Sequence, residues 1–139
     1  TELGNLYFEK NPKDAQEAYQ KALEARPDFF PALLNFGKLQ IVQKNYDSSI
    51  EFLTKAVTLE PASADANHYL GEAYLGAKKG SKAVGYLNEA IRLAPVEKAE
   101  IHLRLASLYN AANLKPKAVE EYKAFLTKVP NYAEKKKIE

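Results

Sequence analysis

The sequence has 139 residues but contains no cysteine and no tryptophan. Without cysteine the chain cannot form a disulfide, use a thiolate as a nucleophile or bind a metal through sulfur. Its longest apolar runs are far shorter than the roughly 20 residues needed to span a bilayer. The net charge of only +2 gives no strong field to attract nucleic acid or an anionic membrane, so neither is expected as a partner.

Arrangements typical of enzymes and cofactor sites are incomplete. The stretch 71–80 contains a Gly-x4-Gly spacing, but Ala77 stands where a phosphate-binding loop requires lysine. No serine has a G-x-S-x-G context. His68 and His102 lack neighbours at metal-ligand spacing, so we expect His102 to be a packing residue and His68 to lie on an open face. We therefore predict no catalytic site, no metal and no cofactor.

What the sequence does contain is a repeat. Similar segments end at four prolines, namely KALEARP at 21–27, KAVTLEP at 55–61, EAIRLAP at 89–95 and AFLTKVP at 124–130. The prolines are 34, 34 and 35 residues apart. A fixed period of this length is typical of a solenoid, in which each repeat is one small unit that buries its apolar face only against its neighbours.

Each period contains two apolar-periodic segments of helical length and no alternation typical of strands. The expected helices cover 2–9, 12–25, 31–43, 46–59, 64–77, 80–94, 97–112 and 115–129, and the tail 131–139 begins one more. Expected helix starts are Asn11 followed by Pro12, and the N-caps Asn45 and Ser63. The closing prolines end the second helix of each pair.

The residues inside the period resemble the tetratricopeptide repeat, which has the pattern W-x2-L-G-x2-Y…A-x3-F…P over 34 residues. Phe36-Gly37, Leu70-Gly71 and Leu105-Ala106 match the L-G pair, and Tyr74 and Tyr109 match the tyrosine. The resemblance implies an all-α, right-handed α-solenoid of antiparallel helix pairs. It implies one domain over 1–139, with repeats near 1–29 (partial), 30–63, 64–97 and 98–132, and the start of a capping helix at 131–139.

Small residues recur where paired helices are expected to cross. Gly37, Gly71 and Ala106 lie in the middle of first helices, where glycine costs about 1 kcal/mol relative to alanine. Close approach of the second helix would explain them, and that helix supplies a small residue in each repeat, namely Ala15, Ser49, Ala83 and Ala118. The sequence departs from the family at Gln40, which replaces its tyrosine, and at Phe125, which replaces an alanine and should redirect the following helix.

In the resembled family, the first helices line a concave groove that binds peptides. Stepping about 100° around each first helix from its packed stripe gives the expected lining. That lining is Asn5, Phe8, Leu34, Lys38, Ile41, Asp65, His68, Glu72, Leu75, Leu103, Ser107 and Asn110, flanked by Asn35, Tyr69 and Arg104. We expect Phe8, Leu34, Ile41, Leu75 and Leu103 to act as apolar anchors, with an acidic partner group near Lys38 and a basic one near Glu72.

Some members of the family hold a partner's terminal carboxylates with lysine, asparagine and arginine side chains. Asn5 and Asn35 match the two asparagines, but Asp65 and Tyr69 stand where a lysine and the arginine belong. Because Asp65 would repel a carboxylate, we do not expect this clamp here.

These patterns favour a non-catalytic scaffold that binds a peptide or helix of another protein. Two alternatives are a structural spacer or homo-oligomer that associates through its repeat ends, and the accessory domain of a larger enzyme. Because the chain begins inside a repeat and without methionine, we expect it to be a piece of a longer protein.

Overall fold

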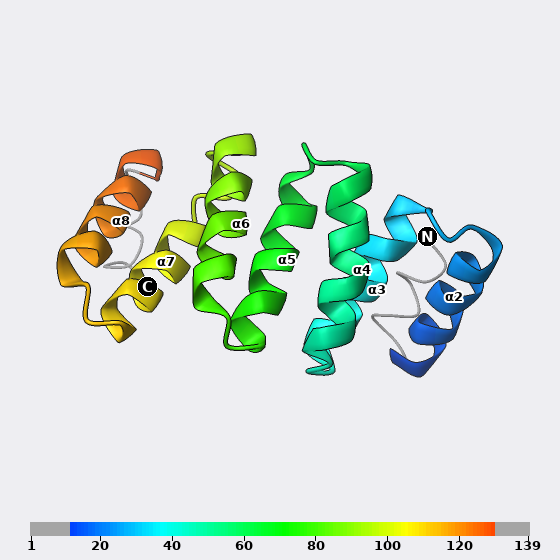
Figure 1. Cartoon of the computed structure of the whole chain (residues 1–139). Coiled ribbons are helices and arrows are strands. Elements are labelled where there is room, and N and C mark those ends of the chain that lie inside the picture. The colour runs from blue at the N-terminus through cyan, green and yellow to red at the C-terminus, as the bar shows by residue number, and fades with distance from the viewer. Residues whose placement is uncertain (1–11, 130–139) are drawn as a thin grey trace, which may run out of the picture.

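The computed structural model describes residues 12–129 and is all-α over that range. Its seven helices are α2 (Pro12–Ala25), α3 (Phe30–Val42), α4 (Tyr46–Leu59), α5 (Ala64–Gly76), α6 (Gly80–Leu93), α7 (Ile101–Ala111) and α8 (Lys115–Lys128). Figure 1 shows them in one row from α2 to α8, with α3–α4, α5–α6 and α7–α8 as antiparallel hairpins. The all-α solenoid of helix pairs predicted from the sequence is confirmed.

Each hairpin turn closes the first helix in the same way. Lys44, Lys78 and Asn113 have φ values of 63°, 62° and 62°, in the left-handed region. After α3, the N–H of Lys44 donates to the carbonyl of Ile41 and the N–H of Asn45 to that of Gln40, at 3.0 and 2.8 Å. This is a Schellman motif, which satisfies carbonyls that the helix end leaves unpaired.

The helix starts bear out part of the expected capping. The Ser63 hydroxyl accepts a hydrogen bond from the Ala66 N–H at 3.1 Å, as predicted. Asn45 is the N-cap residue of α4, as predicted, but its side chain makes no capping hydrogen bond. The turn before α6 is made by Lys78, and Gly80 is the first residue of α6.

The small residues do mark close crossings. A Cβ on Gly71 would lie 2.7 Å from Cδ2 of Leu87 and 3.3 Å from the carbonyl oxygen of Ala83. A Cβ on Gly37 would collide with the side chain of Leu53. The hydroxyl of Ser49 donates to the Gly37 carbonyl at 2.8 Å, so the contact between α3 and α4 is polar as well as close.

The steps between hairpins are unequal. At the α4–α5 step, Tyr46 lies against Gly76, where any added Cβ would strike its ring, and the two helices pack along their length. The α6–α7 step packs much less closely. The helix predicted from residue 97 begins only at Ile101, so that prediction is wrong at its start, and residues 95–100 form turns.

Several predicted features lie outside the described residues. They are the helix over 2–9, the cap at Asn11, the groove residues Asn5 and Phe8, and the capping helix at 131–139. Within residues 12–129, no helix combines the length and the apolar character needed to cross a membrane.

Candidate binding surface

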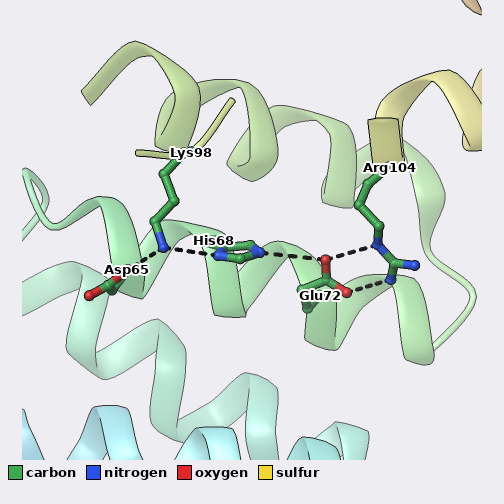
Figure 2. Close-up of polar contacts among 5 residues, drawn as sticks. All are labelled: Asp65, His68, Glu72, Lys98 and Arg104. Atoms are coloured by element: carbon green, nitrogen blue, oxygen red, sulfur yellow. Dashed lines mark hydrogen bonds and ion pairs between the residues drawn. The ribbon is translucent and has the colours of Figure 1, made fainter. Parts of the chain in front are cut away.

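The face of α5 that carries Asp65, His68 and Glu72 is built by helical spacing. These residues are three and four positions apart, which places their side chains in a row on one side of the helix. Asp65 lies in the first turn, where a carboxylate is stabilised by the positive end of the helix dipole. The row faces the turn before α7 and the first turn of α7 itself (Figure 2).

Lys98, in the turn before α7, ties the first half of this row to the fourth repeat. Its Nζ lies 2.5 Å from Oδ1 of Asp65 and 3.2 Å from Nδ1 of His68, and its side chain is only 16% exposed. The hydrogen bond from Lys98 is the main reason why the pKa of Asp65 lies below its ordinary value. A lysine ammonium can only donate, so Nδ1 of His68 accepts and Nε2 carries the ring proton.

Arg104 completes the row from α7. Its Nε and Nη2 donate to the two carboxylate oxygens of Glu72 at 3.1 and 2.5 Å, a bidentate pair (Figure 2). Burial alone would raise the pKa of Glu72 and is the largest single influence on it. The hydrogen bonds from His68 and Arg104 together outweigh that effect, so the pKa lies below its ordinary value.

We call Asp65, Lys98, His68, Glu72 and Arg104 the charged ladder. Its two ion pairs join residues about 30 positions apart in sequence and bridge the loosely packed α6–α7 step. Within the described part of the chain, these charges are satisfied by one another. The ladder therefore holds the third repeat in position relative to the fourth, in addition to forming part of the protein surface.

Tyr69 connects the ladder to the second repeat. The ring of His68 stacks on that of Tyr69 with centroids 4.8 Å apart. Nζ of Lys38 lies 4.7 Å from the centre of the Tyr69 ring, and Nζ of Lys98 lies 5.7 Å from it. The cation expected to meet an acidic partner group is thus held over an aromatic ring, an arrangement worth about 0.5–1 kcal/mol at an exposed site.

A hollow of about 580 Å³ opens beside the ladder, between α5 and the start of α7. Three predicted groove residues on its wall, His68, Glu72 and Arg104, belong to the ladder. Two more, Leu103 and Ser107, come from α7. Glu97 and Glu100, which were not predicted, add carboxylates to this wall on either side of the ladder lysine, Lys98.

The predicted anchors differ in their setting. Leu34, Ile41 and Leu75 are half-buried and pack against the core formed by Leu53, Leu70 and their neighbours. These three are therefore part of the contact between repeats, and a charge introduced there would disturb the fold itself. Leu103 is half-buried at the hollow. Asn35 is half-buried and Asn110 is exposed, and neither belongs to the ladder.

The ladder residue that sequence reasoning missed is Lys98. We expected residues 97–112 to be one helix, and a helix starting at 97 would not leave Lys98 in a turn. One signal was present: no Ser, Thr, Asp or Asn lies between Pro95 and Ile101 to cap such a helix, whereas Ser63 caps α5. The extra residue between Pro95 and Pro130 pointed to the same irregular repeat.

His102, expected to be a packing residue, is buried between α7 and α8, at 8% exposure. Its Nδ1 lies 2.5 Å from Oε2 of Glu121, and Nζ of Lys128 lies 2.7 Å from its Nε2. The prediction that it packs inside the fourth repeat is confirmed, with a polar pairing that the sequence did not reveal.

The comparison with protein families agrees with this architecture. The sequence profile of the tetratricopeptide repeat matches residues 6–54 and 43–99, well over half of the chain. The chain belongs to the tetratricopeptide repeat family. Gly37, Gly71 and the stacked helix pairs are therefore family features, whereas the ladder is built from residues that the repeat pattern does not specify.

Solved structures of similar proteins show the same fold. A crystal structure of MamA shares 30% identity with a TM-score of 0.85, over 94% of this chain and 76% of that one. The pilF protein of Pseudomonas aeruginosa shares 28% identity with a TM-score of 0.80, over 91% of this chain and 58% of its own.

Two curated relatives match shorter stretches. The human mitochondrial import receptor subunit TOM70 is 28% identical over 109 residues, 78% of this chain. The tetratricopeptide repeat and J domain-containing co-chaperone DNJ1 of Fusarium oxysporum is 31% identical over 90 residues, 60% of this chain. The chain spans less than a fifth of the length of either protein. Fold and relatives together indicate a protein-interaction scaffold.

Proposed function

We propose that the chain is a non-catalytic module that binds a peptide or helix of a partner protein along the ladder face, centred on the hollow between α5 and α7. The observation that carries this proposal is the hollow itself, about 580 Å³ in volume and with both charged and apolar walls. The ladder holds these walls in place before a partner arrives, so less conformational freedom is lost on binding.

The charges on the hollow favour a basic side chain in the partner. Lys98 and Arg104 already form ion pairs with Asp65 and Glu72. Glu72 is therefore not available to the basic partner group that the sequence predicts near it. Glu97 and Glu100 are exposed and form no ion pair within the described residues. The partner we propose therefore places a basic residue near Glu97 and Glu100 and an apolar residue against Leu103.

Apolar contact should supply most of the affinity. Burying a side chain of leucine size is worth about 1.5–3 kcal/mol, whereas an exposed ion pair is worth about 1 kcal/mol at most. The carboxylates would then set the direction of the partner and the choice between partners.

Partner capture with surface variants tests this proposal. Ser107→Arg places a large cation in the hollow at an exposed position and should abolish capture. The double change Glu97→Lys, Glu100→Lys should weaken it about tenfold through charge reversal. Glu51→Lys, on an exposed face of α4, is the matched control and should leave capture unchanged. Normal capture by the hollow variants, with loss in the control, would place the binding surface elsewhere.

A second candidate, self-association through the repeat ends, has one observation in its favour. Val119, Tyr122 and Leu126 form a stripe along α8 and are 48%, 47% and 43% exposed. Light scattering across a range of concentrations distinguishes the two functions. A dimer that Tyr122→Glu dissociates would favour self-association, and a monomer at every concentration would favour the binding module.

A further inference from the structure

A second hollow, of about 520 Å³, lies on another side of the molecule. It is formed between α2, α3 and α4, with Leu23, Phe36 and Phe52 as apolar walls and Gln40, Ser48 and Glu24 as polar ones. On α3, Gln40 is two residues beyond Lys38, which turns it about 200° away from the ladder face. This hollow is therefore separate from the surface proposed for peptide binding.

Gln40, one of the residues that line this hollow, carries an unsatisfied polar atom. The residue is only 6% exposed, and its Nε2 donates to the hydroxyl of Ser48 at 2.7 Å. Its Oε1 is buried and has no hydrogen-bond partner in the structure over residues 12–129. Rotating the amide by half a turn would exchange the two atoms, so that one end of the amide stays unpaired in either orientation. Buried polar atoms without a partner are rare because each loses the hydrogen bonds that it makes with water in the unfolded chain.

The other hairpins show what the second repeat lacks. The positions equivalent to Gln40 hold Tyr74 and Tyr109. Lys82 lies 5.6 Å from the centre of the Tyr74 ring, and Lys117 lies 5.7 Å from that of Tyr109. In the second repeat, the same two positions are Gln40 and Ser48.

The aromatic ring that stacks on Tyr74 in the third repeat also has an equivalent in the second repeat. Tyr74 stacks on Tyr86, with ring centroids 5.6 Å apart and an angle of 9° between the planes. Phe52 is equivalent to Tyr86, and it packs on Phe36 at 4.8 Å. The second repeat thus keeps the aromatic wall but lacks the tyrosine that covers it in the third.

We propose that this hollow binds a tyrosine side chain of a partner protein, which takes the place that the repeat's own tyrosine holds in the third repeat. The ring would pack on Phe52 and Leu23. The Gln40 amide, whose unpaired oxygen is buried in the empty hollow, would turn toward the ligand so that its free end bonds to the hydroxyl. A hydroxyl suits either amide orientation because it can both donate and accept, whereas an indole N–H can only donate. The exposed carboxylate of Glu24 at the rim suits a main-chain amide or basic residue beside the tyrosine, which favours a peptide over a free phenol.

The test is a nuclear magnetic resonance titration of the whole chain with p-cresol, which has the tyrosine ring and hydroxyl, and with toluene, which lacks the hydroxyl. We expect p-cresol to shift the Gln40 side-chain amide signals saturably, with a dissociation constant in the millimolar range expected of so small a ligand. Toluene should bind about tenfold more weakly, since it leaves the amide unpaired.

Variants of one residue make the result specific. Gln40→Met keeps the shape of the side chain and should reduce p-cresol affinity to that of toluene. Gln40→Tyr restores the repeat's own ring and should abolish binding; if it fails to fold, Gln40→Met alone decides. Gln43→Met, at an exposed glutamine just after α3, is the matched control and should bind p-cresol like the parent.

A titration with N-acetyl-tyrosine amide distinguishes a tyrosine side chain from a free phenol as the ligand. Shifts at the same signals as p-cresol would support a tyrosine side chain, whereas binding of p-cresol without this compound would overturn the partner assignment in favour of a free phenol. The site itself is wrong if p-cresol leaves the Gln40 signals unmoved, if toluene binds as tightly, or if Gln40→Met binds p-cresol like the parent.

Discussion

The third and fourth helix pairs each place a histidine between a lysine and a glutamate, but in opposite settings. The side chain of His68 is 22% exposed on the ladder face, between Lys98 and Glu72 of neighbouring repeats. The side chain of His102 is only 10% exposed and lies inside its own helix pair, between Glu121 of α8 and Lys128 at the end of that helix. The same three residue types therefore join two repeats in one place and hold one hairpin together in the other.

The two rings also carry their proton on different nitrogens. Lysine can only donate, so Nδ1 of His68 accepts from Lys98, whereas in His102 it is Nε2 that accepts from Lys128. The remaining N–H of each ring points to its glutamate. Burial determines how much each arrangement contributes to stability. Solvent screens the exposed arrangement around His68, whereas water cannot replace a partner lost from the buried arrangement around His102.

The largest expected effect concerns the helix crossings of these two pairs. Gly71→Leu should lower the free energy of unfolding by about 3 kcal/mol, because the new side chain overpacks Leu87 at the α5–α6 crossing. The fourth pair has Ala106 at the equivalent position and already accommodates a Cβ there. Urea denaturation measures the loss.

A second glycine of the same hairpin is the control for that change. A Cβ on Gly85 of α6 would meet nothing within 4 Å. Gly85→Ala should therefore raise stability, by up to about 1 kcal/mol, through helix propensity alone. If Gly71→Leu melts within a degree or two of the parent, the crossing is not tight.

The two histidines provide the next largest difference. His102→Ala should cost about 2 kcal/mol, because it leaves Glu121 and Lys128 half-buried without their partner. His68→Ala should cost less than about 1 kcal/mol, because water can reach the open ladder. Equal losses in equilibrium unfolding would show that burial does not distinguish the two sites.

Lowering the pH should destabilise the exposed arrangement around His68, because Glu72 becomes protonated. Because its folded-state pKa lies below its ordinary value of 4.5, the unfolded chain binds the proton more readily. The stabilisation by Glu72 is therefore complete when the pH is above the ordinary pKa. It is lost as the pH falls through the lower, folded-state pKa. Glu72→Gln should flatten the fall in urea midpoint between about pH 5 and about pH 3 relative to the parent. An unchanged slope would mean that Glu72 is not held by Arg104 and His68 in solution.

The smallest effect compares the turns of the two pairs. Lys78 and Asn113 both have a left-handed backbone, which suits glycine best and asparagine next. Lys78→Gly should raise stability by about 0.5 kcal/mol, and Asn113→Gly should raise it less. Thermal melts of both variants check the order, and a larger gain at Asn113 would reverse it.

The sequence by itself determined the helix pairs, because they follow from local and periodic features. The proline period, the apolar faces and the small residues at Gly37 and Gly71 place the helices, and Ser63 places the start of α5. The departure at Gln40 was visible too, since the repeat allows one hairpin to be read against the next. Near-repeated sequence makes such predictions robust, because each repeat contacts mainly its neighbours.

Only the tertiary structure decided which polar groups meet. Lys98 reaches Asp65 and His68 because α7 starts late, a result of weak capping and packing that the helical period does not encode. The pairing of His102 with Glu121 depends on how α7 and α8 cross. The unpaired atom of Gln40 depends on the space left between three helices. These contacts join residues distant in sequence through long side chains, and their geometry exists only once the repeats have stacked.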